Sequence, residues 1–155
     1  MTFRIHALDP APFAPLFALD EAALAAHRAL RMTSGADTGW PCRISLRDAP
    51  KGTPLLLVNH AYLDAASPYR GTHAIFVSQG AARAHPEPGE VPDMLASRLV
   101  SVRAFDAAGM MLDAEVTEGR ALGPLLADWC ARDTTARVCI HTARQGCFLA
   151  EARTS

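Results

Sequence analysis

The clearest hairpin pattern in the sequence constrains the fold most, because it defines two strands, their turn and their relative direction. Two segments with alternating apolar and polar side chains, 99–105 and 110–117, flank the sequence DAAG at 106–109. This spacing is typical of a type I turn that ends with a glycine in the left-handed conformation. The turn predicts a register in which Arg103 lies opposite Asp113 on a half-exposed polar face. We therefore expect a cross-strand ion pair between them within an antiparallel sheet.

Other segments show strand or helix character between turn signals. Further strands are expected at 3–8, 42–46, 54–58, 73–77, 137–143 and 147–150. Helices are expected at 21–30, behind an N-cap at Asp20, and near 92–97 and 122–130. The sequence thus predicts a single α+β domain over residues 1–155. Its core would be one mainly antiparallel sheet of about seven strands, with two or three helices packed on one side.

The strand at 54–58 is apolar on both faces, which is typical of a central strand. A polar loop at 61–72 connects it to the strand at 73–77. If these two strands pair directly, His60 and His73 lie near each other at the mouth of the loop.

Composition excludes several classes of partner. Half of the residues are hydrophobic, and the formal net charge is −1, which argues against a nucleic acid or an anionic membrane. No apolar run approaches membrane-spanning length, and the N-terminus lacks the apolar core of a secretory signal, so a cytoplasmic location is expected. The four cysteines form no CxxC pair and show no zinc-ligand spacing. We expect four free thiols, no metal and no cofactor.

The familiar nucleotide-binding, zinc-protease and serine-hydrolase motifs are absent. What remains is three groups of polar residues, each beside a glycine or proline at the end of an expected strand. The groups are Trp40, Cys42 and Arg43 in GWPCR, Tyr69, Arg70 and His73 in SPYRGTH, and His141, Arg144 and Cys147 in HTARQGC.

Together these segments resemble a bacterial family known as domain-of-unknown-function family 1203. The resemblance covers nearly the whole chain. It rests on GWPCR (39–43), SPYR followed by HAIFV (67–77), RAFDAAGMMLDAEV (103–116) and HTARQGCF (141–148). The set is specific as a whole, although no single piece would suffice. The resemblance implies no activity, and no catalytic residue is carried over from it.

The residues themselves favour a small-molecule site, with or without enzymatic activity, if the three groups converge. Arginine side chains bind carboxylate or phosphate through paired N–H groups, so a small anion is the expected ligand. The candidate ligand-binding residues are Arg70, Tyr69, Arg43, Arg144 and Trp40. The candidate catalytic residues are His73 and His141 for acid–base chemistry, and Cys147 as a weaker nucleophile.

Each candidate also has a structural interpretation. Arg70 could hold its loop through backbone carbonyls, and the histidines could be satisfied core residues. An alternative function is a non-enzymatic module that binds another protein or forms a homodimer through exposed apolar residues such as Met110 and Met111. A metal site built from His60, His73 and His141 is less favoured, because their spacing is not diagnostic.

Overall fold

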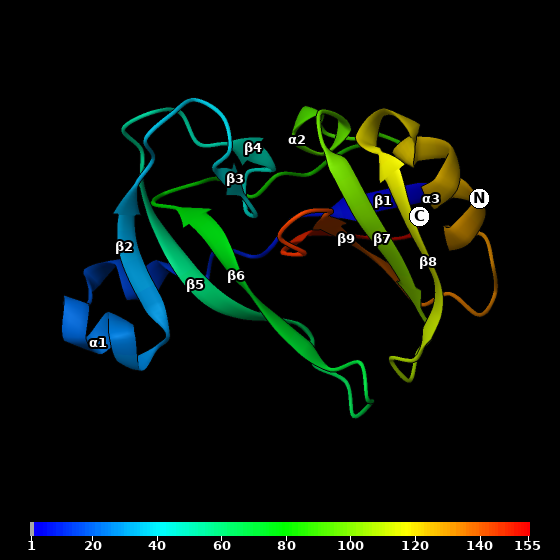
Figure 1. Ribbon diagram of the computed structural model, residues 1–155, viewed down its shortest axis with the longest axis horizontal. Helices are drawn as coiled ribbons and strands as arrows, with labels where there is room; N and C mark the ends of the chain where they lie inside the picture. Colours follow the sequence, from blue (N-terminus) through cyan, green and yellow to red (C-terminus); the bar gives the residue numbers. More distant parts are fainter. Residues whose placement is uncertain (1) are drawn as a thin grey trace.

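Ten strands in two sheets form the framework of the protein in the computed structural model, which describes residues 2–155 (Figure 1). Sheet A has the strand order β1-β10-β9-β7-β8, and all of its neighbouring strands are antiparallel. Its strands are β1 (Phe3–His6), β7 (Leu99–Phe105), β8 (Met111–Glu118), β9 (Arg137–Thr142) and β10 (Phe148–Thr154).

Sheet B has the order β2-β5-β6-β3-β4, and β3 runs parallel to β6. Its strands are β2 (Ala29–Thr33), β3 (Pro41–Cys42), β4 (Arg47–Asp48), β5 (Pro54–Leu63) and β6 (Gly71–Ser78). The α+β class is therefore confirmed, but the expectation of one sheet of about seven strands is wrong. The successive strands β6 and β7 do not pair, because β3 occupies the second edge of β6 and β7 lies between β8 and β9. Alternation identifies a strand, but it does not choose the partner of that strand.

The helices are short and do not all lie on one side. They are the 3-10 turns η1 (Ala14–Ala18) and η2 (Gly119–Ala121), and the α-helices α1 (Glu21–Ala26), α2 (Asp93–Ala96) and α3 (Leu122–Cys130). In Figure 1, α2 and α3 accompany sheet A, whereas α1 lies beside β2 of sheet B. No helix within residues 2–155 is long and apolar enough to cross a membrane.

The start of α1 is as predicted, and its end is not. The Asp20 carboxylate accepts a hydrogen bond from the Ala23 N–H at 2.8 Å, which is the N-cap contact expected from the sequence. The helix stops at Ala26 instead of reaching residue 30. Arg28 adopts a left-handed conformation with φ of 53°, which ends the helix and directs the chain into β2.

Sheet A separates two apolar clusters. One lies between this sheet and the helices α2 and α3, and it contains Val102 and Trp129. The other lies between the two sheets, where Val58 and Ile75 of sheet B meet Phe148 of sheet A. The two sheets therefore share a core, and sheet A is covered on both faces over β9 and β10.

The segment expected as a strand at 42–46 is a tight turn that connects β3 to β4. The Leu46 N–H donates to the Cys42 carbonyl at 3.0 Å, and Leu46 has a left-handed φ of 52°. Within this turn the Arg43 side chain is almost completely buried and donates to the carbonyls of Pro41 and Phe148. The turn allows the Arg43 side chain to reach both carbonyls, whereas an extended strand would direct alternate side chains to opposite faces.

The β7–β8 hairpin has the predicted glycine conformation but a different register. Gly109 has a φ of 79°, as the turn requires. One residue beyond the turn, a β-bulge shifts the pairing. The observed pairs are Phe105 with Met111, Ala104 with Asp113 and Arg103 with Ala114. A one-residue shift places Arg103 and Asp113 on opposite faces of the sheet, so the predicted ion pair is wrong.

Candidate functional site

A cluster of aromatic and imidazole rings lies where the two sheets meet. On sheet B, His60 and His73 are direct cross-strand partners, which confirms the proximity expected if β5 and β6 pair. A β-bulge in β5 follows, and the Tyr62 ring stacks on the His73 ring with the centroids 4.6 Å apart. A side chain at Gly71 would lie 2.8 Å from the Tyr62 hydroxyl oxygen. The glycine of SPYRGTH is thus needed to make room for this ring.

His141 joins the cluster from β9 of sheet A. Its ring meets those of His73 and Tyr62 edge-on, at centroid distances of 5.1 and 4.8 Å. Its Nδ1 lies 3.0 Å from the Gly146 carbonyl oxygen, which can only accept, so Nδ1 carries the proton. The Nε2 lone pair of the fully buried ring has no hydrogen-bond partner among residues 2–155.

The tautomer of His73 follows from the same reasoning. The Phe148 N–H donates to His73 Nδ1 at 3.1 Å, so this nitrogen is the acceptor and Nε2 carries the proton. His73 can therefore offer an N–H to a ligand without rearranging. Because the His73 side chain is only half-buried, solvent or a small molecule can approach it.

All three histidines of the cluster have lowered pKa values. Burial and then the charge of Arg103 lower the pKa of His141 to about 3. The same two causes lower the pKa of His73, with a further contribution from Arg43. The pKa of His60 is lowered by burial and by Arg43. The imidazoles are thus neutral near pH 7 and stand in a positive field.

Arg103 makes the largest charge contribution to the lowered pKa values of His73 and His141. It lies on the inner face of β7, which is the face of sheet A that is directed toward sheet B, and it is half-buried. It forms no ion pair and no hydrogen bond with the part of the chain that the structure describes. Asp113, its partner in the predicted register, instead contacts Arg132 at 2.8 Å near the end of α3. The positive charge of Arg103 is therefore not compensated within residues 2–155.

Arg43 is a second cation without a carboxylate partner in the described chain. Only 2% of it is exposed, and its Nε and Nη1 donate to the carbonyls of Phe148 and Pro41 at 2.7 and 2.6 Å. Burial lowers its pKa to about 10, so it stays charged at neutral pH. The bond to the Phe148 carbonyl joins the 41–48 turn to β10, so Arg43 fixes the backbone of a residue whose ring packs on Tyr62 and His141.

The other candidate residues lie outside the cluster. Arg70 forms an exposed ion pair with Asp64 at 2.8 Å, which favours a role in holding its loop. Tyr69 is exposed and contacts Phe105 edge-on, and Arg144 lies in the exposed turn between β9 and β10. Trp40 packs on Phe76, which points away from the face of β6 that carries His73.

Cys147 is half-buried, and no hydrogen bond joins its thiol to a histidine within residues 2–155. The other three cysteines are buried, and all four are free thiols, as predicted. No group of three or more residues that could hold a metal ion is found among residues 2–155.

Sequence reasoning missed two members of the cluster, Tyr62 and Arg103. The apolar pattern ends this strand at residue 58 and puts Tyr62 in a loop, whereas β5 continues to Leu63. The turn pattern places Arg103 in an ion pair with Asp113, whereas the structure moves Asp113 to the other face of the sheet. Both residues lie beside β-bulges, which are not visible in the alternation of apolar and polar residues.

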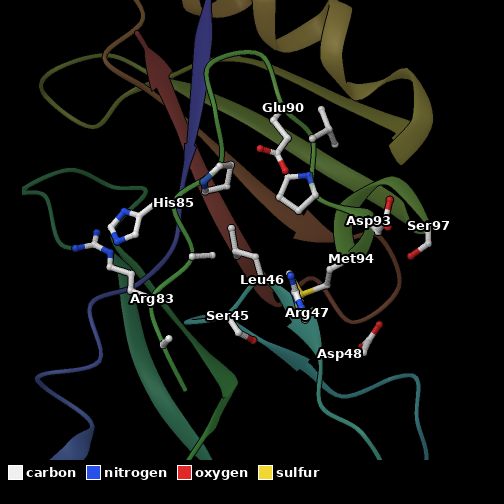
Figure 2. A pocket seen from close by; sticks show the side chains of 15 residues that line it. Ser45, Leu46, Arg47, Asp48, Arg83, His85, Glu90, Asp93, Met94 and Ser97 are labelled. Atoms are coloured by element: carbon white, nitrogen blue, oxygen red, sulfur yellow. The ribbon is translucent and has the colours of Figure 1, made fainter. Parts of the chain in front are cut away.

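A separate cavity of about 910 Å³ lies beside the 41–48 turn (Figure 2). Its walls come from residues 45–48, 82–86, 90–94 and 97. None of the residues predicted as site members lines it. The volume falls in the range of small-molecule binding sites.

A family model matches residues 39–153 under the description "Protein of unknown function (DUF1203)". The chain belongs to the DUF1203 family. No curated protein and no solved structure matches it significantly. The matched residues of this DUF1203 chain include the three histidines of the ring cluster, Arg103 and the walls of the 910 Å³ cavity. They include neither α1 nor β2.

Proposed function

We propose that this DUF1203 protein binds a small anionic molecule at Arg103 and His73, on the inner face of β7. The observation that carries the proposal is the half-buried Arg103 side chain, which has no acidic partner in the described chain and lies beside neutral histidines. A guanidinium removed from water is costly unless a negative group compensates it. A ligand carboxylate or phosphate would supply that charge and match the paired N–H groups of arginine.

The surroundings of Arg103 favour an anion that also has an apolar part. Ala114 lies directly opposite Arg103, and Val116 lies opposite Ser101, so both point to the same face as Arg103. Leu99 reaches this face by strand alternation, and 46% of Leu99 and 56% of Val116 is exposed. An apolar ligand body could cover these side chains while its acidic group meets Arg103. Covering exposed apolar surface stabilises such a complex.

The histidines support binding more than proton transfer. With a pKa of about 3, His141 is too weak a base to abstract protons efficiently near pH 7, and it is fully buried. His73 has its proton on Nε2, because its Nδ1 already accepts the Phe148 N–H. His73 is therefore assigned as a hydrogen-bond donor to the anion, and His141 as an interior residue that positions the Tyr62 and His73 rings.

The test compares benzoate, acetate and the neutral benzamide by thermal shift on the wild type and on Arg103→Gln. Benzoate at about 100 times its Kd should add roughly 2.7 kcal/mol, or about 5–11 °C in Tm. Acetate should act more weakly and benzamide not at all. Arg103→Gln should stay folded and lose the benzoate effect, whereas the exposed Arg120→Gln should keep it. If no anion stabilises the wild type, or if Arg103→Gln responds like the wild type, the proposed function is wrong.

One observation favours a second function, a protein-interaction module. β8 is an edge strand eight residues long, and Leu112 and Val116 on it are 44% and 56% exposed. Unpaired edge strands with exposed apolar side chains pair readily with another chain. Sedimentation equilibrium tests this function, because a dimer that Val116→Lys dissociates would support it and a monomer at all concentrations would exclude self-association.

A further inference from the structure

Three arginines follow one another across β1, β10 and β9 on the inner face of sheet A. Arg4 is the direct cross-strand partner of Arg153. Ala152 pairs with Val138, which brings the adjoining residues Arg153 and Arg137 opposite each other. Ala152 and Val138 belong to the apolar cluster beneath the helices, so the three arginines lie on the opposite face. We call them the arginine row. Like charges directly opposite each other destabilise a sheet, so the row needs a compensating negative group.

Compensation of the arginine row within the chain is incomplete. Glu151 is the only carboxylate that β1, β9 and β10 direct to this face. It contacts Arg137 at 3.4 Å and also pairs with Arg153. Arg4 is half-buried and forms no ion pair and no side-chain hydrogen bond with the rest of residues 2–155. Three guanidinium groups and one carboxylate leave a net charge of +2 on the row.

The groups next to the row add no negative charge. His6 is the direct partner of Glu151, and burial lowers its pKa, so it is neutral near pH 7. Arg83, whose charge also lowers the pKa of His6, adds a further positive group at this edge of the sheet. Toward the other edge, Arg103 is a diagonal neighbour of Arg137. The positive charge of the row is therefore reinforced by its surroundings.

The three guanidinium groups are close enough for one compact ligand. Arg137 and Arg153 both contact the carboxylate of Glu151, so a group of similar size can lie within reach of both. Arg4 and Arg153 are direct partners, and the Cβ atoms of such pairs are about 4.5–5.5 Å apart. The N–H groups that Glu151 does not occupy remain available to a ligand, including all five of Arg4.

We propose that the arginine row binds an oligophosphate chain, either free or as part of a nucleotide. Successive phosphates each carry negative charge and several acceptor oxygens, so one chain can engage three guanidinium groups at once. The row offers little apolar contact, because Phe105 and Cys139 beside it are buried. An acidic peptide would also need apolar anchors, so the surface favours a phosphate chain. This proposal goes beyond the proposed function, because none of the three arginines belongs to the site at Arg103 and His73.

The experiment is isothermal titration calorimetry of the wild type with tripolyphosphate. We expect tripolyphosphate to bind at least tenfold more tightly than orthophosphate, because only the chain can contact all three arginines. Adenosine triphosphate distinguishes the two forms of the ligand. If it binds more tightly than tripolyphosphate, the ligand is a nucleotide, and equal or weaker binding identifies the free chain.

The matched variants are Arg4→Gln, which breaks no ion pair, and the control Arg120→Gln at an exposed arginine on η2. Arg4→Gln should bind tripolyphosphate roughly tenfold more weakly, as the loss of one charge-assisted contact predicts, and Arg120→Gln should bind it as the wild type does. Glu151→Gln should bind it more tightly, because the competing carboxylate is gone.

Four results would overturn the proposal. They are orthophosphate binding as tightly as tripolyphosphate, unchanged tripolyphosphate affinity in Arg4→Gln, weaker binding in Glu151→Gln, and a larger loss of affinity in Arg103→Gln than in Arg4→Gln. The last result would place the phosphates at the Arg103 site instead. Tighter binding of hexaglutamate than of tripolyphosphate would likewise reject the phosphate chain in favour of an acidic peptide.

Discussion

The burial of His141 allows us to predict how the free energy of unfolding depends on pH. Its pKa is about 3 in the folded protein, against an ordinary value of 6.5 in the unfolded chain. As pH falls below 6.5, the His141 imidazole binds a proton in the unfolded chain but stays neutral in the folded protein. The contribution of His141 to stability is therefore complete above pH 6.5 and is lost progressively as pH falls from 6.5 toward 3.

The size of this effect follows from the two pKa values. One pKa unit corresponds to about 1.36 kcal/mol, and pH 5 lies about 1.5 units below the pKa of the unfolded chain. The titration of His141 therefore lowers the free energy of unfolding at pH 5 by roughly 2 kcal/mol relative to pH 8. The variant His141→Asn removes the titration and keeps an amide N–H that can donate to the Gly146 carbonyl. The smaller side chain destabilises the protein by an amount that does not depend on pH, roughly 1–3 kcal/mol.

Urea unfolding at pH 8 and at pH 5 measures the free energy of unfolding and so tests the prediction. The free energy of unfolding of the wild type should fall by at least 2 kcal/mol between these values, because His73 and His60 also have lowered pKa values. In His141→Asn this fall should be smaller by about 2 kcal/mol. Ile140→Val, a destabilising change on the same strand without a titratable group, should leave the fall unchanged. A fall in His141→Asn that matches the wild type within about 0.5 kcal/mol would refute the burial argument.

Three further predictions concern the thiols and the β7–β8 hairpin. In the native protein a thiol reagent such as Ellman's should modify only Cys147, while denatured protein should show all four thiols, because the other three are buried. Gly109→Ala should destabilise the protein by about 2–4 kcal/mol in urea unfolding, because the glycine has a φ of 79° and a methyl group there would lie 2.5 Å from the side chain of a neighbouring loop. Ala114→Asp should place a carboxylate directly opposite Arg103. Benzoate affinity measured by thermal shift should then fall at least tenfold, and unchanged affinity would count against the assigned site.

Local features of the fold could be read from the sequence because their causes are local. The Asp20 cap and the left-handed Gly109 depend on a few neighbouring residues, whereas the proximity of His60 and His73 could be predicted only on the condition that their strands pair. The division into two sheets could not be read in this way. It depends on β3, a two-residue strand that occupies the edge of β6 and is too short to produce an alternating pattern.

The candidate site shows the same limit. His73 and His141 stood out in the sequence because each begins or interrupts an apolar strand beside a loop. Arg70 and Arg144 also follow turn residues, yet the first pairs with Asp64 and the second lies in an exposed turn. A sequence pattern places a residue near a strand end, but the partner that neutralises its charge comes from elsewhere in the fold.

The bulge in β8 decides whether Arg103 is neutralised. In the register set by the turn alone, Asp113 and Glu115 would share the inner face with Arg103, and the ion pair expected from the sequence would form. The extra residue turns β8 over, so that Ala114 and Val116 face Arg103 while Asp113 reaches Arg132 at the end of α3. The sequence pattern predicts an ordinary polar hairpin, but in the structure Arg103 is an uncompensated cation beside apolar residues. A regular strand would have cost less than a half-buried charge without a partner, and this cost supports the proposal that a ligand supplies the missing negative charge.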